Sequence, residues 1–237
     1  MKNELTLTNL LNQTVAELTE NGRIVGIFLA LMVPVSGFFG WVAVAGGAAS
    51  SIFDLSSTTN ILALGGGLIA IGLAAFAFMI ALTYWFYAAL MAYESAPGFG
   101  RIWPWIGIYI LASLGIGFGL ILLIVPGVIL VVRWAIALPL VIEGKIPAMD
   151  TFGESWERTS RYGWSIFGLL VILVIGMLIL TGIVTGISTI LGGQASIPGI
   201  ILAALVDALN SAVFVAVSVA AWRLSTDKSD EVAEVFG

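Results

Sequence analysis

Six long apolar stretches fill most of the 237 residues, and Lys and Arg fall almost entirely in alternate gaps between them. A helix needs about 20 predominantly apolar residues to cross the hydrocarbon core of a bilayer. We therefore expect an all-α polytopic membrane protein with six transmembrane helices. Their expected ranges are 24–47, 61–92, 103–125, 128–142, 164–191 and 198–222.

The distribution of basic residues predicts the orientation of these helices. With a cytoplasmic N-terminus, eight of the nine Lys and Arg residues fall on the cytoplasmic side, and the ninth, Arg133, lies inside an apolar stretch. The segments expected outside, 48–60, 126–127 and 192–197, carry one charge between them, on Asp54. This asymmetry is the positive-inside rule, so both termini are expected in the cytoplasm.

Composition excludes several classes of function. With 60% apolar residues, 10% charged residues and a mean hydropathy of +1.11, the chain has more apolar surface than a soluble domain buries. It has no Cys and no His, which removes thiol nucleophiles, Cys/His zinc sites, haem ligation by His and Ser-His-Asp triads. No basic stripe is present to neutralise nucleic acid. We expect no enzymatic activity, no cofactor, no metal and no nucleic-acid partner.

Two further helices are predicted outside the spans. Apolar residues recur at helical spacing over 6–21, which predicts an amphipathic helix within the cytoplasmic segment 1–23. Residues 147–161 have one apolar face among acidic and basic residues, which is typical of an interfacial helix between the fourth and fifth spans. Residues 223–237 are expected to form an acidic cytoplasmic tail.

Pro126-Gly127 interrupts an otherwise continuous apolar run, 106–142. Because Pro-Gly is a strong turn signal, we expect a tight outer hairpin at these two residues. The helix after it, 128–142, is short for a full span. The hairpin is therefore expected either to span the bilayer or to be re-entrant, with its tip below the outer surface.

Small residues recur every fourth position in the last apolar stretch. This stripe consists of Ala204, Ala208, Ala212, Ala216 and Ala220. Such a stripe lets two helix backbones approach closely inside a membrane. It is expected to pack against helices of the same bundle, or alternatively against another membrane protein or a second copy in a homodimer.

Arg133 and Asp207 are the ionisable residues expected at depth in the bilayer, where such groups are candidates for function. Counted from the outer ends of their helices, Arg133 lies about 9 Å down and Asp207 about 15 Å. We expect the two side chains to face each other, with Asn210 and Ser211 completing a polar network. A fixed ion pair between helices is the leading interpretation; a substrate or proton site, and no contact at all, are the alternatives.

Four residues near the inner face are candidate contacts for anionic lipid headgroups: Arg158, Arg161, Trp156 and Trp164. Carboxylates nearby are also ligands that Mg²⁺ or Ca²⁺ accept. However, Glu154 and Arg158 are spaced i, i+4, which favours a helical ion pair over a metal site.

One stretch, 124–170, resembles a known family. Its motif consists of Pro126-Gly127, Arg133, Ala137-Leu138-Pro139, Glu143-Gly144, Ser155-Trp156 and Thr159. The stretch is similar to the glycerophosphoryl diester phosphodiesterase membrane domain and to related YciC-like bacterial membrane proteins. The resemblance implies a six-helix module of the bacterial inner (plasma) membrane with a role connected to envelope lipids. In fused family members the phosphodiesterase activity belongs to a separate soluble domain that uses His, which this chain lacks.

These observations predict a non-catalytic membrane scaffold or accessory subunit that engages membrane lipids or a partner membrane protein. The alternative is a small transporter of a lipid-like or amphipathic solute that uses Arg133 and Asp207. Dense small-residue packing favours the first interpretation, and the two ionisable residues at depth favour the second.

Overall fold

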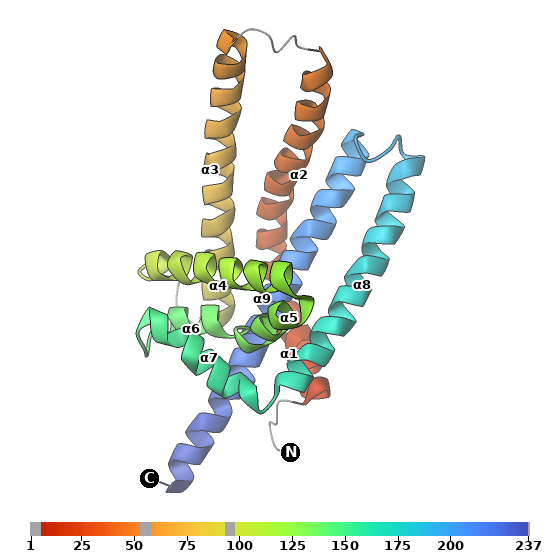
Figure 1. Cartoon of the computed structure of the whole chain (residues 1–237). Coiled ribbons are helices and arrows are strands. Elements are labelled where there is room, and N and C mark those ends of the chain that lie inside the picture. Colours follow the sequence, from red (N-terminus) through yellow and green to blue (C-terminus); the bar gives the residue numbers. More distant parts are fainter. Residues whose placement is uncertain (1–5, 53–57, 93–97, 237) are drawn as a thin grey trace. The chain divides into compact units, whose positions relative to one another are not determined.

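The computed structural model describes residues 6–52, 58–92 and 98–236, with side chains described for 6–44, 70–92 and 98–226. Within these residues the chain forms nine α-helices and one short 3-10 helix (Figure 1). They are α1 Leu7–Glu20, α2 Gly22–Ile52, α3 Thr58–Met91, α4 Ile102–Leu122, α5 Ile124–Arg133, α6 Ala137–Glu143, η1 Ala148–Asp150, α7 Thr151–Ser160, α8 Gly163–Ile190 and α9 Ile197–Phe236. The predicted all-α class is confirmed.

Six segments of the described chain are long and apolar enough to cross a membrane. They are Gly22–Val44, Ala70–Met91, Ile102–Leu122, Ile124–Glu143, Gly163–Ile190 and Ile197–Thr226. The chain is therefore consistent with a multi-pass helical membrane protein. The predicted helices over 6–21 and 147–161 are also present, as α1 and as η1 with α7.

The helices divide into two compact units. Unit 1 comprises Met1–Val25, Tyr84–Val174 and Val213–Gly237; unit 2 comprises Gly26–Thr83 and Ile175–Ala212. Helices α4, α5, α6 and α7 lie wholly in unit 1 and pack on one another (Figure 1). By contrast, α2, α3, α8 and α9 each have residues in both units.

Helix α1 is an integral part of unit 1. The backbone N–H of Asn9 donates to Thr6 Oγ1 at 3.3 Å, which satisfies one of the free amides at the helix start. On the other side of the helix, Leu10 is fully buried in a core with Ile166 and Leu169 of α8 and Leu224 of α9. The amphipathic pattern therefore serves packing within the bundle.

The predicted hairpin turn at Pro126-Gly127 is wrong. The chain turns three residues earlier, at Leu123, whose backbone is extended (φ −158°, ψ 136°). Pro126 falls in the first turn of α5, where a missing N–H costs no helical hydrogen bond. Gly127 allows close packing instead: a Cβ on Gly119 of α4 would lie 2.9 Å from Gly127 Cα.

The predicted fourth span, 128–142, corresponds to the apolar segment Ile124–Glu143, but this segment is two helices instead of one. Helix α5 ends at Arg133, and α6 begins at Ala137. Pro139 explains the break, because a proline has no N–H to donate to the carbonyl four residues earlier, on Ala135, and its ring clashes with that group. Starting α6 at Ala137 places Pro139 in a first turn, where proline is tolerated.

The last helix differs from the prediction in length. It begins at Ile197 and continues to Phe236, past the expected end at 222, so the acidic residues of 223–236 extend the helix. Its start follows a glycine turn, with φ of 104° at Gly192 and 92° at Gly193. The hydroxyl of Ser196 accepts the N–H of Gly199 at 3.2 Å and so caps the first turn.

The alanine stripe of α9 packs inside this chain. Ala204, Ala208, Ala212, Ala216 and Ala220 are all buried. In unit 2, a Cβ on Gly37 of α2 would lie 3.7 Å from Ala204 Cβ, and in unit 1 Ala220 belongs to the core that contains Leu10. The stripe thus packs against helices of the same chain, which is the first of the two predicted roles. Binding of another membrane protein or a second copy stays a prediction without an assigned surface.

Candidate functional site

The break between α5 and α6 exposes backbone carbonyls, and side-chain hydroxyls satisfy them. Ser155 Oγ of α7 donates to the Arg133 carbonyl at 2.7 Å, and Thr159 Oγ1 donates to the same oxygen at 3.1 Å. Ser218 Oγ of α9 donates to the Ala135 carbonyl at 2.6 Å. An apolar environment tolerates a helix break only where such groups replace the lost hydrogen bonds. Ser155 and Thr159 therefore hold α7 against the end of α5.

This anchoring places the Arg133 side chain beside α7. The guanidinium carbon lies 5.4 Å from the ring centroid of Trp156, within cation–π range. Nη1 of Arg133 is buried and has no hydrogen-bond partner among the described residues. Gly163, the first residue of α8, lies beside this group, since a Cβ there would be in van der Waals contact with Nη1 at 3.7 Å. A buried cation without an acceptor is costly, so an anionic partner fits here.

A pocket of about 570 Å³ opens beside Arg133 in unit 1. One end has Arg133, Trp156, Ser160 and Gly163, and the wall that follows is apolar. That wall consists of Ile124, Val125, Val128, Ile129 and Val132 of α5 with Trp164 and Phe167 of α8. One cationic end and one apolar wall are complementary to an amphiphile with an anionic group, such as a lipid. We call this pocket the Arg133 site.

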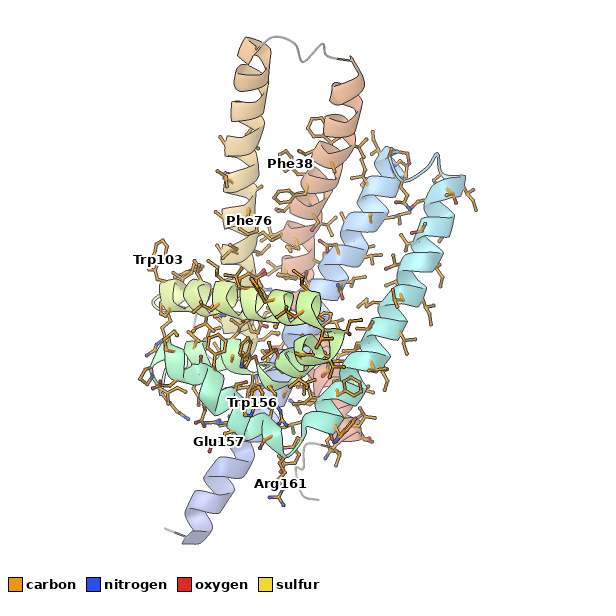
Figure 2. The ribbon with its side chains drawn as sticks, viewed as in Figure 1. Phe38, Phe76, Trp103, Trp156, Glu157 and Arg161 are labelled. Carbon is orange, nitrogen blue, oxygen red and sulfur yellow. The ribbon has the colours of Figure 1, made fainter. Side chains whose placement is uncertain are left out.

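The other predicted headgroup contacts differ in their surroundings. Arg158 Nε lies 2.6 Å from Glu154 Oε1, which confirms the expected i, i+4 ion pair. Arg161 is exposed and projects from the end of α7, as Figure 2 shows. Trp164 is 85% exposed and packs edge-on against Phe167, with ring centroids 5.8 Å apart. Arg161 and Trp164 are therefore accessible at the surface, whereas Arg158 already has a carboxylate partner.

Asp207 lies in unit 2 and has a different set of neighbours. Its Oδ2 accepts the hydroxyl of Ser36 on α2 at 2.7 Å. Asn210, one turn further along α9, has a buried Oδ1 without a hydrogen-bond partner among the described residues. Both residues line a pocket of about 270 Å³ between α8 and α9. Ser211 is half-buried and does not line it.

The predicted Arg133–Asp207 pair stays a prediction. Within its own unit each residue has another neighbour: Trp156 for Arg133 and Ser36 for Asp207. Sequence spacing did not indicate Ser36, because 171 residues separate it from Asp207. The one signal available was its polarity inside an apolar helix, two positions after Pro34.

A buried ion pair in unit 1 was also missed. Glu17 of α1 is 2% exposed, and its Oε1 lies 2.6 Å from Arg223 Nε of α9. Arg223 Nη2 also donates to the Leu90 carbonyl of α3 at 2.6 Å. Burial raises the pKa of Glu17 above its ordinary 4.5, while the Gln13 hydrogen bond and Arg223 oppose that rise. This cluster joins three helices, so we assign it to stability.

Comparison with known proteins adds no further constraint on these sites. No family model matches the chain, no curated protein matches it, and no solved structure matches it. The resemblance to the glycerophosphoryl diester phosphodiesterase membrane domain therefore stays a prediction that depends on the motif in 124–170. In this fold the residues of the motif contact one another around the helix break. Pro139 breaks the helix, and Ser155 and Thr159 bind the Arg133 carbonyl. Trp156 lies under the Arg133 guanidinium.

Proposed function

We propose that this chain is a non-catalytic membrane protein that binds an anionic lipid at the Arg133 site, as a scaffold or accessory subunit. The observation that supports this role is that Arg133 lines the 570 Å³ pocket while its buried Nη1 has no acceptor among the described residues. A lipid phosphate would supply the missing acceptor, and an acyl chain would cover the apolar wall of α5. Hydrogen bonds to charged groups contribute about 1.5–3 kcal/mol.

Native mass spectrometry of the detergent-purified protein tests this proposal. The probes are phosphatidylglycerol, which is anionic, and phosphatidylcholine, which is zwitterionic. We expect wild type to retain phosphatidylglycerol preferentially, and Arg133→Gln to weaken its binding by about 10- to 100-fold, as 1.5–3 kcal/mol implies. Arg161→Gln is the matched control, because Arg161 is exposed outside the pocket. Equal losses in the two variants would show that binding reflects general surface charge.

We further propose that the chain lies in a bacterial inner membrane with both termini in the cytoplasm. The distribution of Lys and Arg supports this orientation. Two reporter fusions test this orientation. A reporter that is active only in the cytoplasm, fused after residue 237, is expected to be active. A reporter that is active only outside the cytoplasm, inserted in the 191–196 loop, is also expected to be active. Activity of both reporters on the same side would contradict the orientation.

A transporter of a lipid-like or amphipathic solute is the second candidate. The polar pocket at Asp207, inside an apolar helix, favours it, because ionisable groups at depth mark pathways in many transporters. Solute uptake into proteoliposomes separates the two functions: a transporter loses uptake in Asp207→Asn, whereas a lipid-binding scaffold shows no uptake in wild type.

A further inference from the structure

Asp207 lacks a countercharge within its own unit. The sequences of Gly26–Thr83 and Ile175–Ala212, which make up unit 2, contain no Lys, Arg or His, and their acidic residues are Asp54 and Asp207. Asp207 nevertheless lies ten residues after the start of α9, within the segment Ile197–Thr226 that is apolar enough to span a membrane. Its side chain is exposed to the pocket between α8 and α9. An ionised carboxylate at such a position needs a positive partner.

The neighbours of the carboxylate are oxygen atoms. Ser36 donates to Oδ2, which leaves Oδ1 and the second lone pair of Oδ2 as acceptors. The buried Oδ1 of Asn210 is a further acceptor without a donor among the described residues. Asp207 and Asn210 are three residues apart and therefore share one face of α9. Their oxygens are both acceptors and cannot satisfy each other, whereas a donor or a cation near both could.

The pocket between α8 and α9 has a row of polar side chains among the apolar residues Met177, Val184, Ala203 and Val206, and it extends from Asp207 to the α8–α9 loop. Thr181, Thr185 and Ser188 line the pocket from α8, where their i, i+4, i+7 spacing places them on one face. Gln194 lines it at the loop, and α9 lines it from Gly199 to Asn210, a length of about 16 Å at 1.5 Å per residue. Hydroxyl and amide groups along an otherwise apolar pair of helices form a path for a hydrated or partly hydrated ligand.

The composition of the site selects the class of ligand. A carboxylate, an amide oxygen and hydroxyls are hard oxygen ligands, and the site carries one negative charge. Divalent cations in all-protein sites are usually held by several carboxylates, and the described part of the pocket contains one. Softer metals prefer His and Cys, which are absent from the sequence. We propose that Asp207, Asn210 and the Thr181/Thr185 face of α8 form a binding site for a small monovalent cation such as Na⁺. This inference does not depend on the lipid site at Arg133.

Equilibrium binding of ²²Na⁺ to the purified full-length protein in detergent at pH 8 tests the proposal. We expect saturable binding of one Na⁺ per chain in wild type and at least a tenfold loss of affinity in Asp207→Asn. Thr181→Val removes a hydroxyl from the pocket and is expected to weaken binding severalfold. Thr189→Val is the matched control, because the Thr189 hydroxyl bonds the Gly186 carbonyl of its own helix and does not line the pocket; its affinity is expected to equal that of wild type.

Thr181→Val keeps the test decisive if Asp207→Asn does not fold, since a Thr-to-Val change preserves shape and charge. Absence of saturable Na⁺ binding in wild type overturns the proposal, and so does equal affinity in wild type and Thr181→Val. Two specific results would identify another occupant of Asp207. Binding that appears only in Arg133→Gln would show that Arg133 neutralises the carboxylate. A melting temperature that depends on pH but not on Na⁺ would show that a proton does.

Discussion

Units 1 and 2 differ sharply in how they treat charge. All nine Lys and Arg residues of the sequence belong to the segments of unit 1, together with twelve of the fourteen acidic residues. In unit 1 charged side chains have charged, aromatic or carbonyl neighbours, as Glu17 and Arg223 show. Unit 2 holds Asp207, an acid within an apolar helix, whose carboxylate accepts a hydrogen bond from the neutral hydroxyl of Ser36. Unit 1 therefore holds a paired, buried charge cluster as well as Arg133, whereas the sequence of unit 2 offers Asp207 no basic residue.

The same contrast bears on how the helices cross a membrane. Unit 1 contains every segment that the positive-inside rule places in the cytoplasm, together with the expected outer segment 126–127. Unit 2 contains the other two expected outer segments, 48–60 and 192–197. Helices α4, α5 and α6 never leave unit 1. These features favour a re-entrant hairpin over a full span.

Cysteine labelling tests whether the α4–α5 hairpin reaches the outer surface, and the readout is all-or-none because the chain has no Cys of its own. Val125, next to the α4–α5 turn, is 68% exposed in the structure. We expect Val125→Cys in intact cells to escape a membrane-impermeant maleimide added outside, and Gln194→Cys in the α8–α9 loop to react. Lys145→Cys, whose side chain is 66% exposed, is the cytoplasmic control and is expected to react only after lysis. Outside labelling of Val125→Cys would establish a full span.

Loss of a charged partner is expected to have the largest effect on stability. Arg223→Met leaves Glu17 buried without its cation, and breaking a buried pair in this way costs about 3–5 kcal/mol. Arg161→Met removes the same charge and keeps a similar apolar stem at an exposed position of unit 1. Unfolding in mixed detergent–SDS micelles measures both free energies. A similar loss for the two variants would contradict a structural role for the Glu17–Arg223 pair.

The hydroxyls at the helix break are expected to contribute less. Ser218→Ala leaves the Ala135 carbonyl without its donor, at a position where Pro139 cannot supply one, and we expect a loss of about 1–2 kcal/mol. Ser113→Ala is the control: its hydroxyl donates to the Tyr109 carbonyl within the regular helix α4. That carbonyl lies in an unbroken helix, so we expect a change below about 0.5 kcal/mol. The same unfolding measurement compares the two, and equal losses would show that the break needs no external donor.

How far the sequence predicts this molecule depends on the range of the interactions involved. Apolar run length and the pattern over 6–21 predict the spans and α1, because both depend on neighbouring residues. The hairpin was misplaced because Pro126-Gly127 satisfies the rules for a turn and also those for a first helical turn. At the candidate sites, the sequence identified Arg133 and Asp207 as candidate functional residues, because each is an ionisable residue in an apolar stretch. Their neighbours Trp156 and Ser36 come from other helices, which no local pattern specifies.

The smallest expected effect concerns pH and the buried acid of unit 1. Because burial raises the pKa of Glu17 in the folded protein, folding favours its protonated form. The corresponding contribution to the unfolding free energy is fully present below about pH 4.5, the ordinary pKa of the group, and is lost as the pH rises through the raised value. Wild type is therefore expected to lose this increment of stability on going from pH 4 to pH 7.

Glu17→Gln isolates that increment, because the amide cannot titrate while every other acid, including Asp207, remains unchanged. The unfolding free energies of wild type and Glu17→Gln are measured from pH 4 to pH 7 in a non-ionic detergent. As the pH rises, the unfolding free energy of wild type is expected to fall relative to that of Glu17→Gln. A flat difference for Glu17→Gln would mean that Arg223 offsets the cost of burying this carboxylate throughout. The paired charges of unit 1 would then cost nothing in the physiological range, and the contrast with the Asp207 carboxylate of unit 2 would become sharper.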